Sequence, residues 1–191
     1  MSEQRIICIG GSNGAPLLAL SLLEKLPRGF GAPILLALHM PPPLTASYAK
    51  ALAGKLELNT AMAVNETVPE PGWVYVCPGG MHIGLGKTGR IVVTPKPDGT
   101  PFKPSIDILF HTAAQNARAN TVAVVLKGLT VKRDARQGAL SVAHAGGRVI
   151  VQGDGADAVF GMPRDVIEAG AASDVLPLAE IPRKLLSLTQ G

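Results

Sequence analysis

Three side chains able to perform acyl-transfer chemistry each follow a predicted strand. Ser12 lies in the turn Gly10-Gly11-Ser12-Asn13-Gly14, which satisfies the pattern G-x-S-x-G between a predicted strand and a predicted helix. Such a turn presents a serine hydroxyl on a sharp bend, and it leaves backbone N–H groups at the start of the helix to face an oxyanion. His39 follows the second predicted strand, and Asp134 lies in the loop after a later one. If these loops converge, the three residues form a Ser-His-Asp triad.

Each of the three residues also has a simpler interpretation. A glycine-rich turn often binds phosphate or only closes a tight bend. A histidine at a strand end is commonly a structural residue, and Asp134 is also placed to cap the helix that follows it. A dinucleotide site requires G-x-G-x-x-G here and an acidic residue after the second strand, where the chain has His39. The joint placement at three strand ends supports catalysis as strongly as the simpler interpretations. The order Ser…His…Asp differs from that of α/β-hydrolases.

The elements that must position these residues follow from alternating apolar and helical patterns. Apolar runs predict buried strands at 5–10, 33–38, 121–126, 147–151 and 174–176. Helical patterns predict helices at 15–26, 44–53, 105–118, 134–145, 163–169 and 181–188. Small strands or a hairpin are expected at 73–77, 81–85 and 90–94, followed by a proline-rich loop at 95–104. We therefore expect one domain over residues 1–191, an α/β fold with a doubly wound, mostly parallel, Rossmann-like sheet and a small β-hairpin insertion.

Composition excludes several other classes of protein. The 191 residues are 47% hydrophobic and 17% charged, which is too apolar for a disordered chain. The net charge is +4, and the chain lacks the dense basic stripe with aromatic residues that is typical of a nucleic-acid-binding surface. The N-terminus has no signal-peptide pattern, and no apolar stretch reaches about 18 residues. We expect a cytoplasmic protein that neither binds nucleic acid nor inserts into a membrane.

The cysteines and histidines predict neither a disulfide nor a metal site. Cys8 and Cys77 lie inside apolar runs, as buried thiols do. The histidines show no spacing typical of metal ligands; they are His39, His82, His111 and His144. No metal and no other cofactor is therefore expected.

Six sequence blocks, in order, resemble the catalytic domain of bacterial chemotaxis protein-glutamate methylesterases (CheB-type). They are IGGSNG at 9–14, LHMPP at 38–42, PGGMHIGL at 78–85, KPSIDILFHTAA at 103–114, VVLKGL at 124–129 and VFGMPRDVIEAG at 159–170. The resemblance runs from about residue 5 to residue 188, and chance agreement of all six blocks in this order is very improbable.

The resemblance implies a serine carboxyl-ester hydrolase that removes methyl esters from glutamate side chains of chemoreceptors, with glutamine deamidation as a second activity. Its triad would be Ser12, His39 and Asp134, acting through an acyl-enzyme. The oxyanion hole or pocket would involve Gly11, Asn13, Met40, Leu129 and Met162. The implied partners are methylated cytoplasmic helices of receptors or another protein ester, and a receiver domain or a kinase in trans.

Two further positions in the matching blocks are expected to be mainly structural. His82 is expected to form hydrogen bonds within its loop, near the rim of the site. Asp107 begins a predicted helix and is expected to cap it or to form a pair there.

The chain departs from the family pattern around the acid. The family usually has T-G-M-G-x-D-G-A-x-G, whereas residues 127–138 form a longer loop with fewer glycines. This loop carries the basic residues Lys127, Lys132, Arg133 and Arg136. We expect a divergent member with an altered substrate or weak activity. Two alternatives stay open: a weakened or inactive signalling or binding module on the same fold, and a phosphate or nucleotide binder.

The predicted fold begins at residue 5, whereas family members commonly begin with a phosphoacceptor receiver domain that covers the active site. The chain is therefore expected to be either a stand-alone esterase or an excised catalytic domain.

Overall fold

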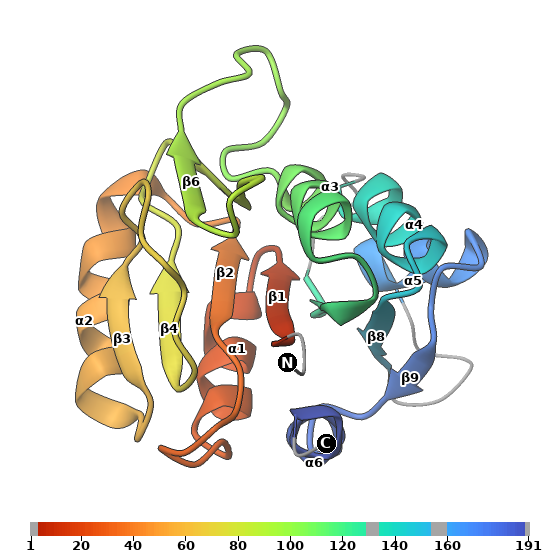
Figure 1. Cartoon of the computed structure of the whole chain (residues 1–191), viewed down its shortest axis with the longest axis horizontal. Helices are drawn as coiled ribbons and strands as arrows, with labels where there is room; N and C mark the ends of the chain where they lie inside the picture. Colours follow the sequence, from red (N-terminus) through yellow and green to blue (C-terminus); the bar gives the residue numbers. More distant parts are fainter. Residues whose placement is uncertain (1–3, 129–133, 154–159, 190–191) are drawn as a thin grey trace.

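A parallel sheet runs through the centre of the molecule. The computed structural model describes residues 4–128, 134–153 and 160–189. Within these residues, seven strands pair in parallel in the order β3-β4-β2-β1-β7-β8-β9 (Figure 1). The strands are β1 (Ile6–Gly11), β2 (Ile34–Leu38), β3 (Asn59–Met62), β4 (Trp73–Val76), β7 (Thr121–Val125), β8 (Arg148–Gln152) and β9 (Asp174–Leu176). The later strands lie on both sides of β1, with β2, β4 and β3 on one side and β7, β8 and β9 on the other, which confirms the predicted doubly wound α/β fold.

Helices cover both faces of this sheet, because alternate side chains of each central strand point to opposite faces. In β1, Ile7 and Ile9 pack with one set of helices, whereas Ile6 and Cys8 pack with the other. The first set is α1 (Ala15–Leu23), α2 (Thr45–Lys55) and α6 (Ile181–Thr189). The second set is α3 (Ile106–Ala117), α4 (Arg136–His144) and α5 (Met162–Glu168). Short 3-10 helices occur at η1 (Pro42–Leu44) and η2 (Arg118–Asn120).

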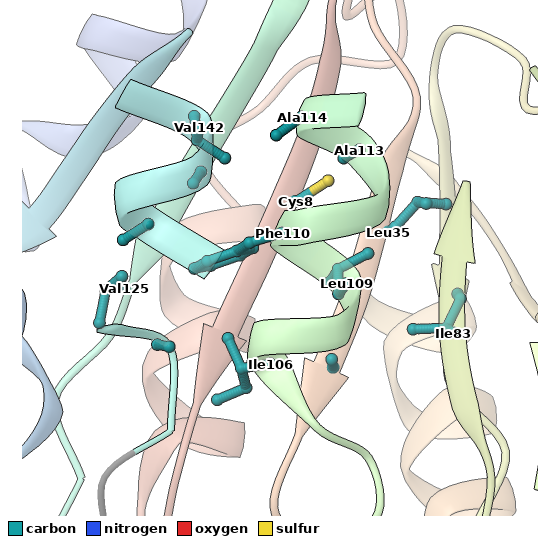
Figure 2. Packing of buried hydrophobic residues seen from close by; sticks show 14 of the residues in the cluster. Cys8, Leu35, Ile83, Ile106, Leu109, Phe110, Ala113, Ala114, Val125 and Val142 are labelled. Atoms are coloured by element: carbon teal, nitrogen blue, oxygen red, sulfur yellow. The ribbon is translucent and has the colours of Figure 1, made fainter. Parts of the chain in front are cut away.

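Helix α3 lies very close to the sheet. Figure 2 shows Leu109 and Ala113 of α3 over Cys8 of β1 and Leu35 of β2. A Cβ atom on Gly10 would overlap the side chain of Ile106, so the end of β1 needs a glycine for α3 to begin at this place. This close packing fixes the start of α3 beside the turn that carries Ser12.

The expected hairpin insertion is present, but one predicted member belongs elsewhere. Strands β5 (His82–Leu85) and β6 (Ile91–Thr94) pair antiparallel and pack beside α3. Strand β4 pairs in parallel with β2 and so belongs to the main sheet. The structure adds β3 at the sheet edge, which the apolar pattern did not indicate because its residues are partly exposed.

Both cysteines are free and buried, as their apolar surroundings predicted. None of the helices in the described ranges has the length and apolar character needed to cross a membrane.

Candidate active site

The topology of the sheet brings three loops to one edge. Strand β1 lies between β2 and β7, and all three run in parallel, so their carboxyl ends are neighbours. Ser12 follows β1, His39 follows β2, and Asp134 lies on the path from β7 to α4. Ligand and catalytic sites of doubly wound sheets lie at such a point, where the chain leaves the central strands in opposite directions.

The three side chains lie within hydrogen-bond reach of one another. His39 Nδ1 is 3.2 Å from Ser12 Oγ, and His39 Nε2 is 2.9 Å from Asp134 Oδ2. With the proton on Nε2, this nitrogen donates to the carboxylate and Nδ1 presents its lone pair to the serine. The two nitrogens therefore exchange the roles that they have in chymotrypsin-like proteases.

Asp134 is held by the first turn of α3. Its Oδ2 accepts from the Ile106 N–H at 2.7 Å, and its Oδ1 accepts from the Asp107 N–H at 2.9 Å. The Ser105 hydroxyl and the Ala135 N–H also donate to Oδ1, at 3.2 and 3.1 Å. The side chain is 2% exposed, and burial opposes its ionisation. The hydrogen bonds from His39 and from the helix N-terminus outweigh this effect and hold the pKa of Asp134 below its usual value.

His82 lies next to Ser105, at the start of α3, and does not contact Ser12. It is fully buried, and burial lowers its pKa. Its Nδ1 accepts from the Ser105 N–H at 3.0 Å, and its Nε2 is 3.2 Å from Thr100 Oγ1. His82 therefore joins the loop before α3 to the start of α3, in agreement with the structural role expected for it.

A cleft opens directly above the serine. It has a volume of about 410 Å³ and is lined by Ser12, Asn13, His39, Met40, Pro41, Pro101, Phe102 and Lys103. Ser12 itself is only 1% exposed, so its hydroxyl lies at the floor of the cleft. A neighbouring, mostly apolar cleft of about 430 Å³ shares Asn13 and is lined also by Gly14, Leu17, Leu18, Lys127, Gly128 and Phe160.

The backbone turns sharply between Ser12 and the start of α1. Gly14 adopts a left-handed conformation with φ +89°, which turns the chain sharply between Ser12 and the helix. The Ala15 N–H bonds to the Ser12 carbonyl at 2.8 Å. Among the described residues, no acceptor is found for the N–H groups of Asn13 and Gly14. These two backbone donors directly follow Ser12 in the chain.

The other predicted pocket residues are distributed unevenly. Asn13 and Met40 line the cleft, whereas Gly11 is buried at the end of β1 against Ala15. Leu129 lies outside the described residues. Met162, the first residue of α5, lines neither cleft: its side chain is 1% exposed and belongs to the buried core cluster that contains residues of α3 and α4.

Sequence reasoning missed two contributors to the site. The ring of Phe102 stacks on the imidazole of His39, with ring centroids 4.8 Å apart and an interplanar angle of 14°. Gly128 lies directly against the serine, since a Cβ atom added there would be 2.6 Å from Ser12 Cβ. The only sequence signal for Phe102 was an aromatic residue inside the proline-rich loop.

The four basic residues of the loop around the acid fall partly outside the described residues. Lys132 and Arg133 lie outside the described residues, whereas Lys127 lines the apolar cleft and Arg136 is the first residue of α4. Over the described ranges, no group of three or more His, Cys, Asp or Glu side chains is placed to hold a metal ion.

Comparison with known proteins places this geometry in a family. A model of the family described as CheB methylesterase matches residues 7–185. The chain belongs to the CheB methylesterase family.

Among its relatives, the protein-glutamate methylesterase/protein-glutamine glutaminase of Chromohalobacter salexigens is 37% identical over 194 aligned residues, covering all of this chain and 54% of the relative. The protein of the same name from Thermotoga maritima is 37% identical and covers 96% of this chain and 54% of the relative. This chain therefore spans about half the length of these relatives. The crystal structure of the Thermotoga maritima CheB methylesterase catalytic domain superposes with a TM-score of 0.87 at 36% identity, covering 96% of this chain and 98% of that one.

Proposed function

We propose that this chain hydrolyses γ-methyl esters of glutamate side chains on methylated chemoreceptor helices. The observation that carries the proposal is the continuous hydrogen-bonded path from Ser12 through His39 to Asp134 at the floor of a cleft. The names and family of its relatives indicate the ester. The second activity in those names, deamidation of glutamine, requires the same acyl transfer with ammonia as the leaving group.

The distances between the three side chains are compatible with the following roles in the proposed acyl transfer. His39 Nδ1 accepts the proton of Ser12 as Oγ attacks the ester carbonyl carbon, and the imidazolium that forms is stabilised by Asp134. The carbonyl oxygen becomes an oxyanion that the N–H groups of Asn13 and Gly14 can bind.

Collapse of the tetrahedral intermediate breaks the bond to the methoxy group. His39 returns the proton to the departing oxygen, and methanol leaves the acyl-enzyme. Water then attacks the acyl carbon with His39 as base, and this step releases glutamate and regenerates Ser12.

Two alternatives make different structural demands. An inactive signalling module on this fold does not require Asp134 to stay within reach of His39, yet their distance is 2.9 Å. A phosphate or nucleotide binder needs the glycine turn for its ligand but gives no reason for a histidine 3.2 Å from Ser12.

The proposal is tested by methanol release from membranes that carry methylated receptors. Wild-type chain should release methanol, Ser12→Ala should release none above background, and Ser21→Ala should behave as wild type. Ser21 is a matched control because it is exposed on α1, the helix that follows Ser12. Equal release by the wild type and Ser12→Ala, or no release by the wild type, would overturn the proposal.

A further inference from the structure

The face of the catalytic histidine is covered by an aromatic ring from a distant loop. Phe102 lies parallel to His39, with an interplanar angle of 14° and a centroid distance of 4.8 Å. This distance is within the roughly 6 Å over which a cation is attracted to the face of an aromatic ring. The His39 side chain is only 14% exposed, so little water competes with this contact.

The loop that carries Phe102 is tied to the same network that holds the acid. Because His82 Nδ1 accepts from the Ser105 N–H, the proton of its neutral imidazole lies on Nε2, which donates to Thr100 Oγ1. The Thr100 hydroxyl is then free to donate to the Phe102 carbonyl at 3.2 Å.

The loop that carries Phe102 also contains an ion pair. Lys103 Nζ and Asp98 Oδ1 form an ion pair at 2.9 Å, although Asp98 is largely exposed and such pairs contribute little by themselves. The hydrogen bonds through Thr100 and His82 therefore dominate the placement of the ring. Ser105, which binds His82, also donates to Asp134. The supports of Phe102 and of Asp134 thus meet at Ser105.

We propose that Phe102 is a positioning residue for the reaction, and that its ring face stabilises the positive charge that appears on His39 in the transition state. This inference rests on the proposed function, since the charge in question is the one that arises when His39 accepts the proton of Ser12 during acyl transfer. Because His39 is neutral before the attack and charged during it, the attraction is stronger in the transition state than in the ground state. Such an interaction raises kcat and leaves KM nearly unchanged.

A leucine and a tyrosine at position 102 separate the aromatic face from the volume of the side chain. Phe102→Leu keeps an apolar side chain but removes the ring, whereas Phe102→Tyr keeps the ring. With a soluble peptide carrying a glutamate γ-methyl ester, Phe102→Leu should lower kcat by about five- to tenfold with little change in KM. Phe102→Tyr should stay within about twofold of the wild-type kcat.

An NMR measurement reports the stacking itself, independently of activity. The carbon-bound ring protons of His39 should show an upfield ring-current shift in the wild type and in Phe102→Tyr, and this shift should be lost in Phe102→Leu. Melting temperatures of the three proteins establish that they are folded.

Two outcomes would overturn the inference. One is a Phe102→Leu variant with wild-type kcat, and the other is an equal loss of kcat in the leucine and tyrosine variants, which would make the role one of shape alone. Either result leaves the proposed function standing as long as Ser12→Ala abolishes wild-type hydrolysis. Absence of Ser12-dependent hydrolysis in the wild type would instead overturn the proposed function.

Discussion

Asp107 and Asp134 are joined so that one carboxylate holds the segment that carries the other. The Asp107 N–H donates to Asp134 Oδ1 at 2.9 Å, and Asp107 Oδ1 accepts from the Gly138 N–H at 2.6 Å. Asp107 therefore lies in the first turn of α3 but caps α4, whose own N-cap residue provides no side-chain hydrogen bond. The two helix starts are locked together around the acid of the triad.

Replacing Asp107 by Asn should change how stability depends on pH. Burial raises the pKa of Asp107 to about 6, and the nearby Asp134 carboxylate contributes to the rise. The folded chain thus holds this proton more tightly than the unfolded chain, so the wild type loses stability as pH rises from about 4 to about 6. The Asn amide does not titrate, and its oxygen can still accept from Gly138. We expect the melting temperature of Asp107→Asn, relative to wild type, to increase over this interval.

The measurement is a series of thermal melts of both proteins at closely spaced pH values. A difference in melting temperature that stays constant between about pH 4 and pH 7 would contradict the assigned role of the Asp107 carboxylate.

Replacing Asp134 by Asn should affect both turnover and stability. The amide cannot stabilise the imidazolium and favours the wrong tautomer of His39, which costs kcat on the order of 10⁴-fold in a comparable triad. Its NH₂ group would also face donors that now bond to the carboxylate, at a cost of about 1–3 kcal/mol. Folding lowers the pKa of Asp134, so the ionised carboxylate stabilises the folded state above about pH 4, and this contribution is lost as the pH falls below that value. The stabilities of wild type and Asp134→Asn should therefore converge in acid.

Turnover with a glutamate methyl ester peptide and urea unfolding at neutral and acid pH check these two effects. Asp165→Asn provides the control, since Asp165 lies on α5 and lines neither cleft. An Asp134→Asn variant that keeps turnover within tenfold of wild type would show that the Asp134 carboxylate is not the acid of a triad.

The sequence was most informative where local chemistry and topology agree. Uninterrupted apolar runs identify β1, β2 and β7, and parallel strands bring their following loops to one edge. The convergence of Ser12, His39 and Asp134 could therefore be anticipated, although the distances between them could not.

Other features depend on contacts that leave no periodic pattern. Strand β3 is a partly exposed edge strand, and its polar first residue, Asn59, breaks the apolar alternation. The stacking of Phe102 on His39 depends on the path of an irregular loop. Asp107 was expected at the start of its own helix, but its carboxylate caps a different one. Met162 belongs to a sequence block that resembles the family, but its side chain lies in the core. The sequence could not show this, because it does not reveal which side of α5 is buried.

Ala135 and Ala139 form a matched pair for testing backbone strain beside the acid. Both side chains are fully buried, but Ala135 has φ +80° whereas Ala139 lies inside α4. Removing a buried methyl group costs about 0.8 kcal/mol at either position. At Ala135 this loss is offset by relief of roughly 1–2 kcal/mol of left-handed strain, whereas at Ala139 glycine adds about 1 kcal/mol of helix penalty. Ala135→Gly should thus lie within about 1 kcal/mol of wild type, and Ala139→Gly should lose about 2 kcal/mol.

Urea unfolding of the two variants decides this prediction. Equal destabilisation by both substitutions would mean that the left-handed conformation at Ala135 stores no strain.

A methyl group at Gly128 should disable the serine without unfolding the chain. Its Cβ atom would lie 2.6 Å from Ser12 Cβ and 3.0 Å from Ser12 Cα, so the serine turn or the start of the acid loop must move. A displacement of about 1 Å at a reacting group can reduce turnover on the order of 100-fold. The matched control is Gly54→Ala in α2, where a Cβ atom meets nothing within 4 Å. Alanine there should leave turnover unchanged and add about 0.5–1 kcal/mol of stability. Turnover and melting temperature are measured for both variants, and a folded Gly128→Ala protein with nearly wild-type turnover would show that this contact does not position Ser12.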